Sequence, residues 1–383
     1  MAMNEPLRIN LEVRNELNLA ETMSQCYQCG SCTATCPLNE YGTNGSEKMT
    51  PRKLFHQAQL GLEPDQLVWN CSSCKLCETR CPRQVNIVEN IQHIRRHSYR
   101  RKQVPPEFEK VLWNLLEEAN PNGEPKAKRD EWARNLNLKA ATEGTDYLFY
   151  VGGPESYDRR LQSVATNMVE IMQRSLVDFG ILGKQEPSSG ETVKEIGDYA
   201  YLDYMIEKNV ELFNSTGANN IIVLSPHAYD LMKHIYPEYG LEAEVIHYTE
   251  FLDQLWQDDV LMFNTKIDER ITYHDPCFLG RYNSVYDQPR NLLEGMGVEL
   301  IEMKDNKQNA LCCGGGGDQM YRNSEDGVRL SDVRVNQAAD TEATGLITSC
   351  GYCIQNFEDS VKVTGKEMAV TDVVELVVRS VRK

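Results

Sequence analysis

Thirteen cysteines, arranged in groups of fixed spacing, constrain this 383-residue chain more than any other feature. Eight of them precede residue 82, none lies between positions 82 and 276, and five follow. Structural disulfides are rare in reducing compartments, so this many thiols favour metal binding or redox chemistry. The spacing within each group then indicates which metal site to expect.

The first eight cysteines form two runs of the pattern C-x2-C-x2-C-x3-C-P. This spacing is typical of proteins with two cubane [4Fe–4S] clusters. The first three thiolates of a run hold one cluster, and the fourth, before proline, reaches the neighbouring cluster. We therefore predict two cubanes, the first on Cys26, Cys29, Cys32 and Cys81, and the second on Cys36, Cys71, Cys74 and Cys77.

Two zinc sites are the main alternative, because paired C-x2-C motifs also occur in zinc ribbons. Zinc has no use for a third cysteine at two-residue spacing followed by Cys-Pro, given twice, so iron is favoured. Between the runs, Thr50, Pro51 and Gly61 are typical of the start and end of a helix. Val85, Val88, Ile91 and Ile94 form a helical stripe after the second run, so this region should be mainly helical.

The last five cysteines follow the pattern C-x34-CC-x36-C-x2-C. Residues 271–274 and 345–348 resemble strands that end just before a cysteine, and helical patterns follow at 332–339 and 352–361. Ligands at the carboxyl ends of parallel strands are usual in open α/β sheets. Free buried thiols are the alternative, although packing alone does not require an adjacent pair and a C-x2-C. The metal-ligand prediction falls on Cys277, Cys312, Cys313, Cys350 and Cys353.

The stretch without cysteines, residues 146–260, repeats the layout of the C-terminal region. Strand-like segments at 147–151 and 221–224 match those at 271–274 and 345–348. The offsets are 277 − 153 = 124, 312 − 188 = 124 and 350 − 225 = 125. Three matches at one offset predict a duplicated domain. In the first copy the five cysteine positions are Gly153, Ser188, Ser189, Ser225 and Ala228.

These motifs resemble those of heterodisulfide reductases. The segments YHDPC (273–277), CCGGGG (312–317) and CYQCGSC (26–32) are similar to the cysteine-rich "CCG" domain and ferredoxin-type part of that family. The order of parts resembles the fused D-type subunit. Relatives include the K-type subunit of the sulfite-reduction complex, ETF-linked iron–sulfur oxidoreductases and the C-type subunit of anaerobic glycerol-3-phosphate dehydrogenase.

The resemblance implies that the intact CCG motif holds one noncubane [4Fe–4S] cluster through the five C-terminal cysteines. The first copy departs from the family pattern, because glycine and alanine offer no ligand and serine oxygen suits iron poorly. We therefore expect this degenerate copy to hold no cluster. Two-site relatives split a heterodisulfide between a pair of such clusters, so a single cluster puts that paired mechanism in doubt.

Several other side chains have more than one interpretation. His274 could support the cluster site or bond a backbone group. Arg281 could pair with an anionic substrate or stabilise the negative charge of a cluster, whereas His227 and His247 are expected to be structural. The cationic segment 93–102 is expected to be solvated, with a docking patch for an acidic partner as the alternative.

Composition restricts the cellular setting. The formal net charge of −17 argues against binding to nucleic acid. No apolar stretch approaches the ~18–20 residues that cross a bilayer, and residues 1–18 lack the apolar core of a secretory signal. We expect a cytoplasmic chain without a transmembrane span of its own, peripheral to the membrane only through a partner subunit.

The predicted fold class is α+β multidomain, a mainly helical two-[4Fe–4S] ferredoxin domain followed by two pseudo-repeated α/β CCG domains. The expected boundaries are 1–100 for the helical domain, 101–145 for an ordered linker, 146–265 for the degenerate copy and 266–383 for the intact copy. The linker contains Trp113, Leu115, Leu116 and Trp132, which we expect to be buried.

The function expected from this organisation is electron transfer within a larger redox complex. Electrons would pass through both cubanes to the noncubane cluster, which would reduce a disulfide or related sulfur–sulfur bond. The alternative is a pure relay in a flavin-containing, electron-bifurcating complex resembling class II benzoyl-CoA reductase, and a scaffold is a third possibility. Expected partners are a flavin-containing A-like subunit or a membrane cytochrome subunit, with a thiol or disulfide substrate or a small redox protein.

Overall fold

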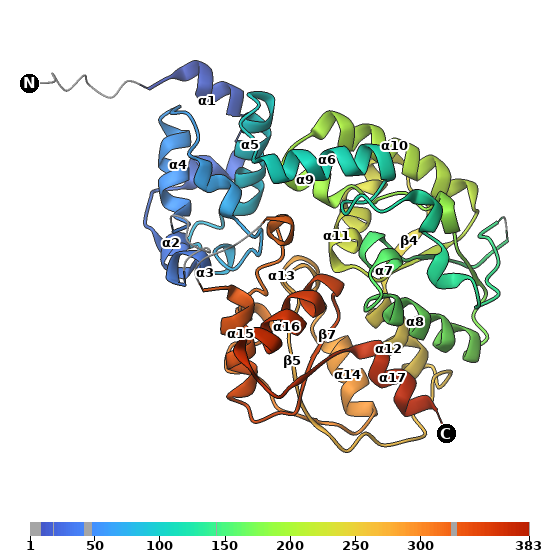
Figure 1. Cartoon of the computed structure of the whole chain (residues 1–383). Helices are drawn as coiled ribbons and strands as arrows, with labels where there is room; N and C mark the ends of the chain where they lie inside the picture. The colour runs from blue at the N-terminus through green and yellow to red at the C-terminus, as the bar shows by residue number, and fades with distance from the viewer. Residues whose placement is uncertain (1–8, 18, 42–47, 143, 323–327, 383) are drawn as a thin grey trace, which may run out of the picture.

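The computed structural model describes residues 9–17, 19–41, 48–142, 144–322 and 328–382. The prediction that residues 1–18 lack a secretory signal therefore falls partly outside the described residues. Figure 1 shows a helical N-terminal region followed by two α/β halves, as the sequence predicts. Among the described residues, no helix is long and apolar enough to cross a membrane.

The N-terminal region is built from short helices around the cysteine loops. The predicted helix after Thr50 begins at Pro51, although the Thr50 side chain makes no capping hydrogen bond. The predicted apolar stripe is confirmed, because Val88, Ile91 and Ile94 are at most 2% exposed. The helices are α1 (Leu11–Leu17), α2 (Ser31–Thr35), α3 (Pro37–Glu40), α4 (Pro51–Gln59) and α5 (Ile87–Arg100).

Two four-stranded parallel sheets follow, with the orders β2-β1-β3-β4 and β6-β5-β7-β8. The identical order confirms the predicted duplication. The same capping box begins the helix after the last strand of each sheet, at His247 and at Asp372, and 372 − 247 = 125. The strands are β1 (Tyr147–Tyr150), β2 (Phe179–Gly180), β3 (Asn220–Val223), β4 (Glu244–His247), β5 (Arg270–Tyr273), β6 (Glu299–Leu300), β7 (Gly345–Thr348) and β8 (Ala369–Asp372).

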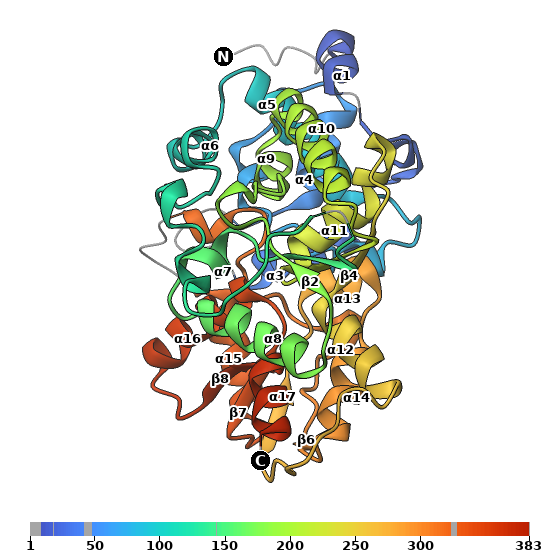
Figure 2. The ribbon, with the colours of Figure 1, turned by 90° about the vertical axis from the view of Figure 1, so that its right-hand side faces the viewer.

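Helices cover both sheets and join the two copies. Helix α8 packs against α17, and α12 against α14, and these pairs lie side by side in Figure 2. The copies therefore face each other across a shared core. The helices of the first copy are α7 (Gly153–Tyr157), α8 (Gln162–Arg174), α9 (Glu191–Ile196), α10 (Tyr199–Ser215), α11 (Pro226–His234) and α12 (Tyr248–Gln257). Those of the second are α13 (Cys277–Asn283), α14 (Asp287–Gly295), α15 (Leu330–Ala339), α16 (Gly351–Thr364) and α17 (Val373–Val381).

The linker contains helix α6 (Pro106–Glu118), and here the burial prediction is partly wrong. Leu115 is buried as expected, but Trp113 is 63% exposed and Leu116 is 54% exposed. The helical period explains the difference. Phe108, Val111 and Leu115 share one face that packs inward, whereas Trp113 and Leu116 lie on another face.

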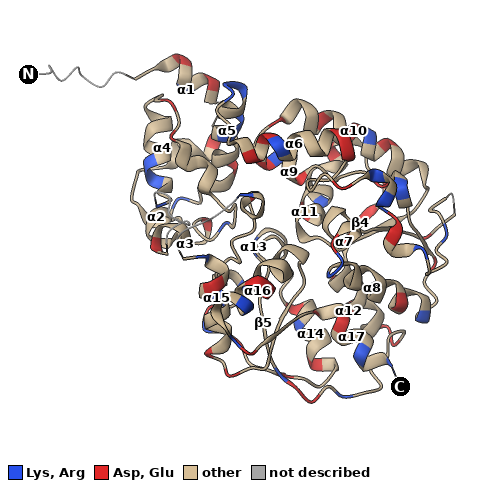
Figure 3. Ribbon diagram, in the orientation of Figure 1, with Lys and Arg blue, Asp and Glu red and all other residues tan. Residues whose placement is uncertain are grey.

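The cationic segment at the end of α5, visible as blue residues in Figure 3, was expected to be solvated, but part of it is buried. Arg95 is completely buried and its Nη1 lies 3.0 Å from Oε2 of Glu195 on α9. Glu195 also accepts hydrogen bonds from Ser73 and Gln92, and Arg95 donates to the carbonyl of Cys71. A buried ion pair therefore ties a cysteine loop to the first α/β copy.

Removing one partner of that pair should be costly, because it leaves an uncompensated buried charge. We expect Glu195→Ala to lower the free energy of unfolding by about 3–5 kcal/mol, measured by thermal denaturation. The control is Glu211→Ala, which breaks an exposed pair with Lys208 and should leave the stability almost unchanged. Equal effects of the two substitutions would contradict a structural role for the buried pair.

Asp372, the residue that caps α17, gives a pH-dependent stability. Its carboxylate accepts hydrogen bonds from Tyr248 of the first copy and from the Val374 amide, and burial raises its pKa to about 7. The folded state therefore keeps a proton that the unfolded chain has lost, so stability falls as pH rises towards about 7. Between about pH 5.5 and 8, we expect Asp372→Asn to gain about 2 kcal/mol relative to the wild type. Parallel melting curves of the two proteins at all pH values would contradict this.

Candidate iron–sulfur sites

The first predicted set of four cysteines lines a single pocket beside α2 and α4. Cys29 is exposed and the other three are half-buried. Arg52 and Arg83 also line the pocket, and a hydrogen bond with the Ser31 side chain lowers the pKa of Cys29. Cations and donors beside thiols favour the thiolate, which is the form that binds iron. The pocket is lined by Cys26, Cys29, Cys32 and Cys81 together with Phe55, Val85 and Ile87.

The second predicted set lines a neighbouring, more enclosed pocket. Its other walls are mainly apolar, with Leu38, Met49, Val88 and Ile91. Burial raises the pKa of Cys71 to about 12 and also raises that of Cys77, since desolvation disfavours a thiolate. Binding of iron at these thiols must therefore release protons. The four predicted ligands that the structure brings together here are Cys36, Cys71, Cys74 and Cys77.

The five C-terminal cysteines converge from three loops at the carboxyl ends of β5 and β7. All five are buried, with exposures of 6% or less. The sulfur of Cys353 lies 3.3 Å from that of Cys313, and a hydrogen bond with Cys312 raises the pKa of Cys277. Cys350, at the start of α16, is bonded to Cys353 through a hydrogen bond. Five buried thiols in one connected group match the donor set expected for the noncubane cluster.

Single-ion sites are a separate matter. In the part of the chain that the structure describes, no group of three or more His, Cys, Asp or Glu side chains is placed to hold one metal ion.

The second and third cysteine sets adjoin each other, a contact that sequence reasoning missed. A hydrogen bond with Cys312 raises the pKa of the buried Cys74 thiol, although 238 positions separate the two residues (312 − 74 = 238). The glycine-rich loop makes this approach possible. A Cβ on Gly317 would lie 2.2 Å from the carbonyl oxygen of Cys71, and one on Gly316 would lie 2.5 Å from that of Ser72.

Arg281 lies at this junction. Its Nε donates to the carbonyl of Cys74 and its Nη1 donates to that of Ala310. Burial by itself would lower the pKa of the Arg281 guanidinium, but the nearby thiols of Cys74, Cys277 and Cys312 raise it above the usual value. Two roles were considered for Arg281 from the sequence, pairing with an anionic substrate and stabilising the negative charge of a cluster. Its place between the cysteine sets favours the second role.

Three histidines differ in how well their roles were predicted. His247 is structural as expected, because its ring bonds Thr249 and the Leu224 carbonyl. The ring of His274 accepts a hydrogen bond from Arg334 rather than bonding a backbone group. His227 was expected to be structural, but interaction with the Cys350 thiol outweighs burial and raises the pKa of its ring. No local pattern marks His227, because the two residues lie in different copies.

Comparison with known proteins agrees with this geometry. Residues 20–85 match the model of the 4Fe-4S dicluster domain, and residues 271–358 match the cysteine-rich domain, CCG. The D-type subunit of the "Dihydromethanophenazine:CoB--CoM heterodisulfide reductase" of Methanosarcina barkeri is 27% identical over 387 residues, which cover 93% of both chains. The chain is a heterodisulfide reductase D-like iron–sulfur protein.

Two further relatives are oxidoreductases. The "Probable iron-sulfur-binding oxidoreductase FadF" of Bacillus subtilis is 33% identical, covering 88% of this chain and 50% of the relative. The "EtfAB:quinone oxidoreductase" of Syntrophomonas wolfei is 29% identical, covering 92% of this chain and 57% of the relative. The present chain therefore spans only about half the length of these two proteins.

A solved structure supports the fold alone. The "hypothetical protein from Helicobacter pylori" covers 98% of this chain with a TM-score of 0.56 at 10% identity, and the match covers 73% of that chain.

Together these findings define the protein at a coarse level. It is an iron–sulfur protein related to D-type heterodisulfide reductase subunits and to ETF-linked oxidoreductases. Its dicluster domain implies two [4Fe–4S] clusters, and the cysteines of the CCG domain suggest an additional one.

Proposed function

We propose that this chain carries electrons through two cubanes to a noncubane [4Fe–4S] cluster that reduces a sulfur–sulfur bond. The observation that carries the proposal is the contact between Cys74 of the second set and Cys312 of the third. It gives electrons a short route between ligand groups of two clusters. The first two sets are neighbours too, because in this proposal each cysteine run supplies the fourth ligand of the other cubane.

The proposal assigns the thirteen cysteines as predicted from the sequence, and the domains as 1–100, 101–145, 146–265 and 266–383. Two observations support the ligand assignment. Each cubane set lines one pocket, and the five C-terminal thiols form one connected group. The five positions of the degenerate copy hold glycine, serine and alanine, which favours an empty site there.

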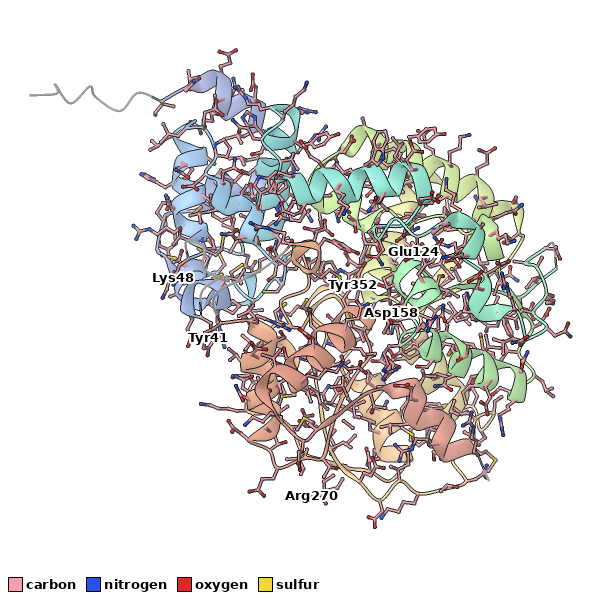
Figure 4. All side chains as sticks on the ribbon, in the orientation of Figure 1. Tyr41, Lys48, Glu124, Asp158, Arg270 and Tyr352 are labelled. Carbon is pink, nitrogen blue, oxygen red and sulfur yellow. The ribbon has the colours of Figure 1, made fainter. Side chains whose placement is uncertain are left out.

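A cavity beside the third set favours catalysis there. Its volume is about 290 Å³, and it opens to solvent where the two α/β copies meet. Figure 4 labels Tyr352, which lies on its wall between the copies. The side chain of Asn356 reaches from this wall to 3.9 Å from the sulfur of Cys313. The other lining residues are Asn122, Pro154, Met320, Tyr321 and Gln355.

The chemistry follows from this arrangement. Reduction of R–S–S–R′ consumes two electrons and two protons and releases RSH and R′SH. The cluster, when bound, supplies the electrons at the sulfur–sulfur bond. The chain's own residues bind and orient the substrate, because the described lining of the cavity offers amide and phenol groups of Asn356, Gln355 and Tyr352 and no charged side chain. Such a lining suits an uncharged, hydrogen-bonding disulfide.

The relay remains the second candidate function, and a specific observation favours it. All five thiols of the third set are buried, so a cluster there would be shielded from solvent and could pass electrons to a partner. The partner in either case would be a flavin-containing subunit, resembling the A-type subunit of heterodisulfide reductase, or a membrane cytochrome subunit.

Electron paramagnetic resonance of the anaerobic protein during a redox titration distinguishes these functions. The probe is bis(2-hydroxyethyl) disulfide, an uncharged disulfide. Under the proposal it alters the signal of the third cluster and leaves both cubane signals unchanged. Asn122→Trp, at the exposed edge of the cavity, should weaken that response, whereas the control Asn135→Trp should not. If the disulfide leaves the signal of the third cluster unchanged, the result would instead support the relay.

A further inference from the structure

His227 of the cysteine-free copy is held in one orientation against the third cysteine set. It lies in the first turn of α11 and is 8% exposed. Its ring stacks on Phe278, with 3.8 Å between ring centroids and 24° between planes. The edge of Tyr352 packs against it at 4.9 Å and 88°. Both aromatic residues sit directly beside cysteines of the third set, so the imidazole is fixed relative to those thiols.

Packing on Phe278 and Tyr352 places the ring beside the loops that carry Cys277 and Cys350. Burial opposes the charged form of the ring, but interaction with the Cys350 thiol, across the boundary between the copies, raises the pKa of His227. Cys350 already interacts with Cys353 inside its own copy, so His227 is its contact from the other one. Glu155, also from the cysteine-free copy, approaches the same place. If Gly351, the residue after Cys350, carried a Cβ atom, that atom would lie only 2.5 Å from Oε1 of Glu155.

These side chains hold equivalent places in the repeat. Glu155 follows Gly153 by two residues, and His227 follows Ser225 by two, so each lies just beyond a position where the intact copy has a cysteine. The loops that have lost their thiols therefore still point their side chains at the shared boundary. The degenerate copy supplies groups that face the intact site, rather than a second cluster.

We propose that the cysteine-free copy is a positioning domain for the third cluster, in which the His227 ring donates an N–H hydrogen bond to the ligand sulfur of Cys350. Hydrogen bonds to ligand sulfurs are among the main determinants of iron–sulfur reduction potentials. A donor stabilises the extra negative charge of the reduced cluster, and more strongly in a buried site than in water. His227 therefore raises the potential of this cluster and favours electron flow to it from the cubanes. The inference rests on the proposed function, because it takes Cys350 as a cluster ligand.

The test is a redox titration of the full chain monitored by electron paramagnetic resonance. His227→Phe keeps an aromatic ring against Phe278 but removes the donor, and His227→Gln replaces it with an amide N–H. In the Phe variant the third cluster should have about a tenfold lower ratio of reduced to oxidised form at a fixed solution potential. This corresponds to a shift of about 59 mV for a one-electron couple. The Gln variant should recover most of the wild-type potential.

Two internal controls accompany this test. The cubane potentials should not move in any variant, and His234→Phe, at an exposed position of the same helix, should leave all three potentials unchanged. A third-cluster potential that is the same in wild type and His227→Phe overturns the inference while leaving the proposed function intact. Loss of the third cluster from both His227 variants would make the residue structural and also overturn it. Absence of a third cluster from the wild type would overturn the proposed function as well.

Discussion

Cys353→Ala is expected to lower the iron content from about 12 to about 8 atoms per chain and to abolish disulfide reduction, while both cubane signals persist. The reason is the position of this thiol. Its sulfur lies 3.3 Å from that of Cys313, and it also interacts with Cys350, so its loss removes one of the five predicted ligands and two contacts within the group. Neither cubane pocket is lined by Cys353, so those sites should keep their iron.

Iron and sulfide analysis, together with the electron paramagnetic resonance spectrum of the reduced protein, measures this effect. Val363→Ala is a suitable control, because Val363 lies on the same helix α16 and is 65% exposed. Unchanged iron content in Cys353→Ala would remove this residue from the ligand set. Loss of four irons with full activity of the assembled complex would instead indicate that the C-terminal copy is a scaffold.

Cys74→Ala should interrupt electron flow at the junction of the second and third sets. The variant is expected to lose the second cubane and to retain the first cubane and the third cluster, giving about 8 irons per chain. The third cluster should still be reduced by dithionite, a small reductant. A reduced flavodoxin should reduce the third cluster more slowly than in the wild type, because the variant lacks both the second cubane and the Cys74–Cys312 contact.

Rapid-freeze electron paramagnetic resonance after mixing with the reduced flavodoxin shows the order in which the clusters are reduced. In the wild type both cubanes and then the third cluster should acquire electrons. The exposed Val363→Ala variant again serves as the control. If the third cluster of Cys74→Ala were reduced as fast as that of the wild type, electrons would reach it by a route that avoids the second cubane.

Local sequence patterns predicted the framework of this protein well. The predicted strands 147–151, 221–224, 271–274 and 345–348 agree with β1, β3, β5 and β7 to within one residue at each end. Strand and helix periods, and the 124- to 125-residue offset, are properties of neighbouring residues or of simple repetition, so they are visible without a structure. The cysteine sets were equally accessible, because cluster ligands follow characteristic spacings.

The contacts that join the parts were not predictable in this way. Cys74 meets Cys312, and His227 meets Cys350, only because the two copies and the helical region pack together. The exposure of Trp113 was missed for a related reason. An aromatic residue in a linker was expected to be buried, but which face of α6 packs inward depends on the neighbouring elements.

The most direct test of the account is quantitative iron and sulfide analysis of the anaerobically purified protein, combined with the resonance spectrum at full reduction. Three four-iron clusters correspond to about 12 irons and 12 sulfides per chain, which is the expected result. Magnetic interaction between the second cubane and the third cluster is also expected, because their ligands Cys74 and Cys312 are in contact. About 8 irons, with the five C-terminal thiols free to react once the protein is unfolded, would show that the third site holds no cluster and would contradict the account.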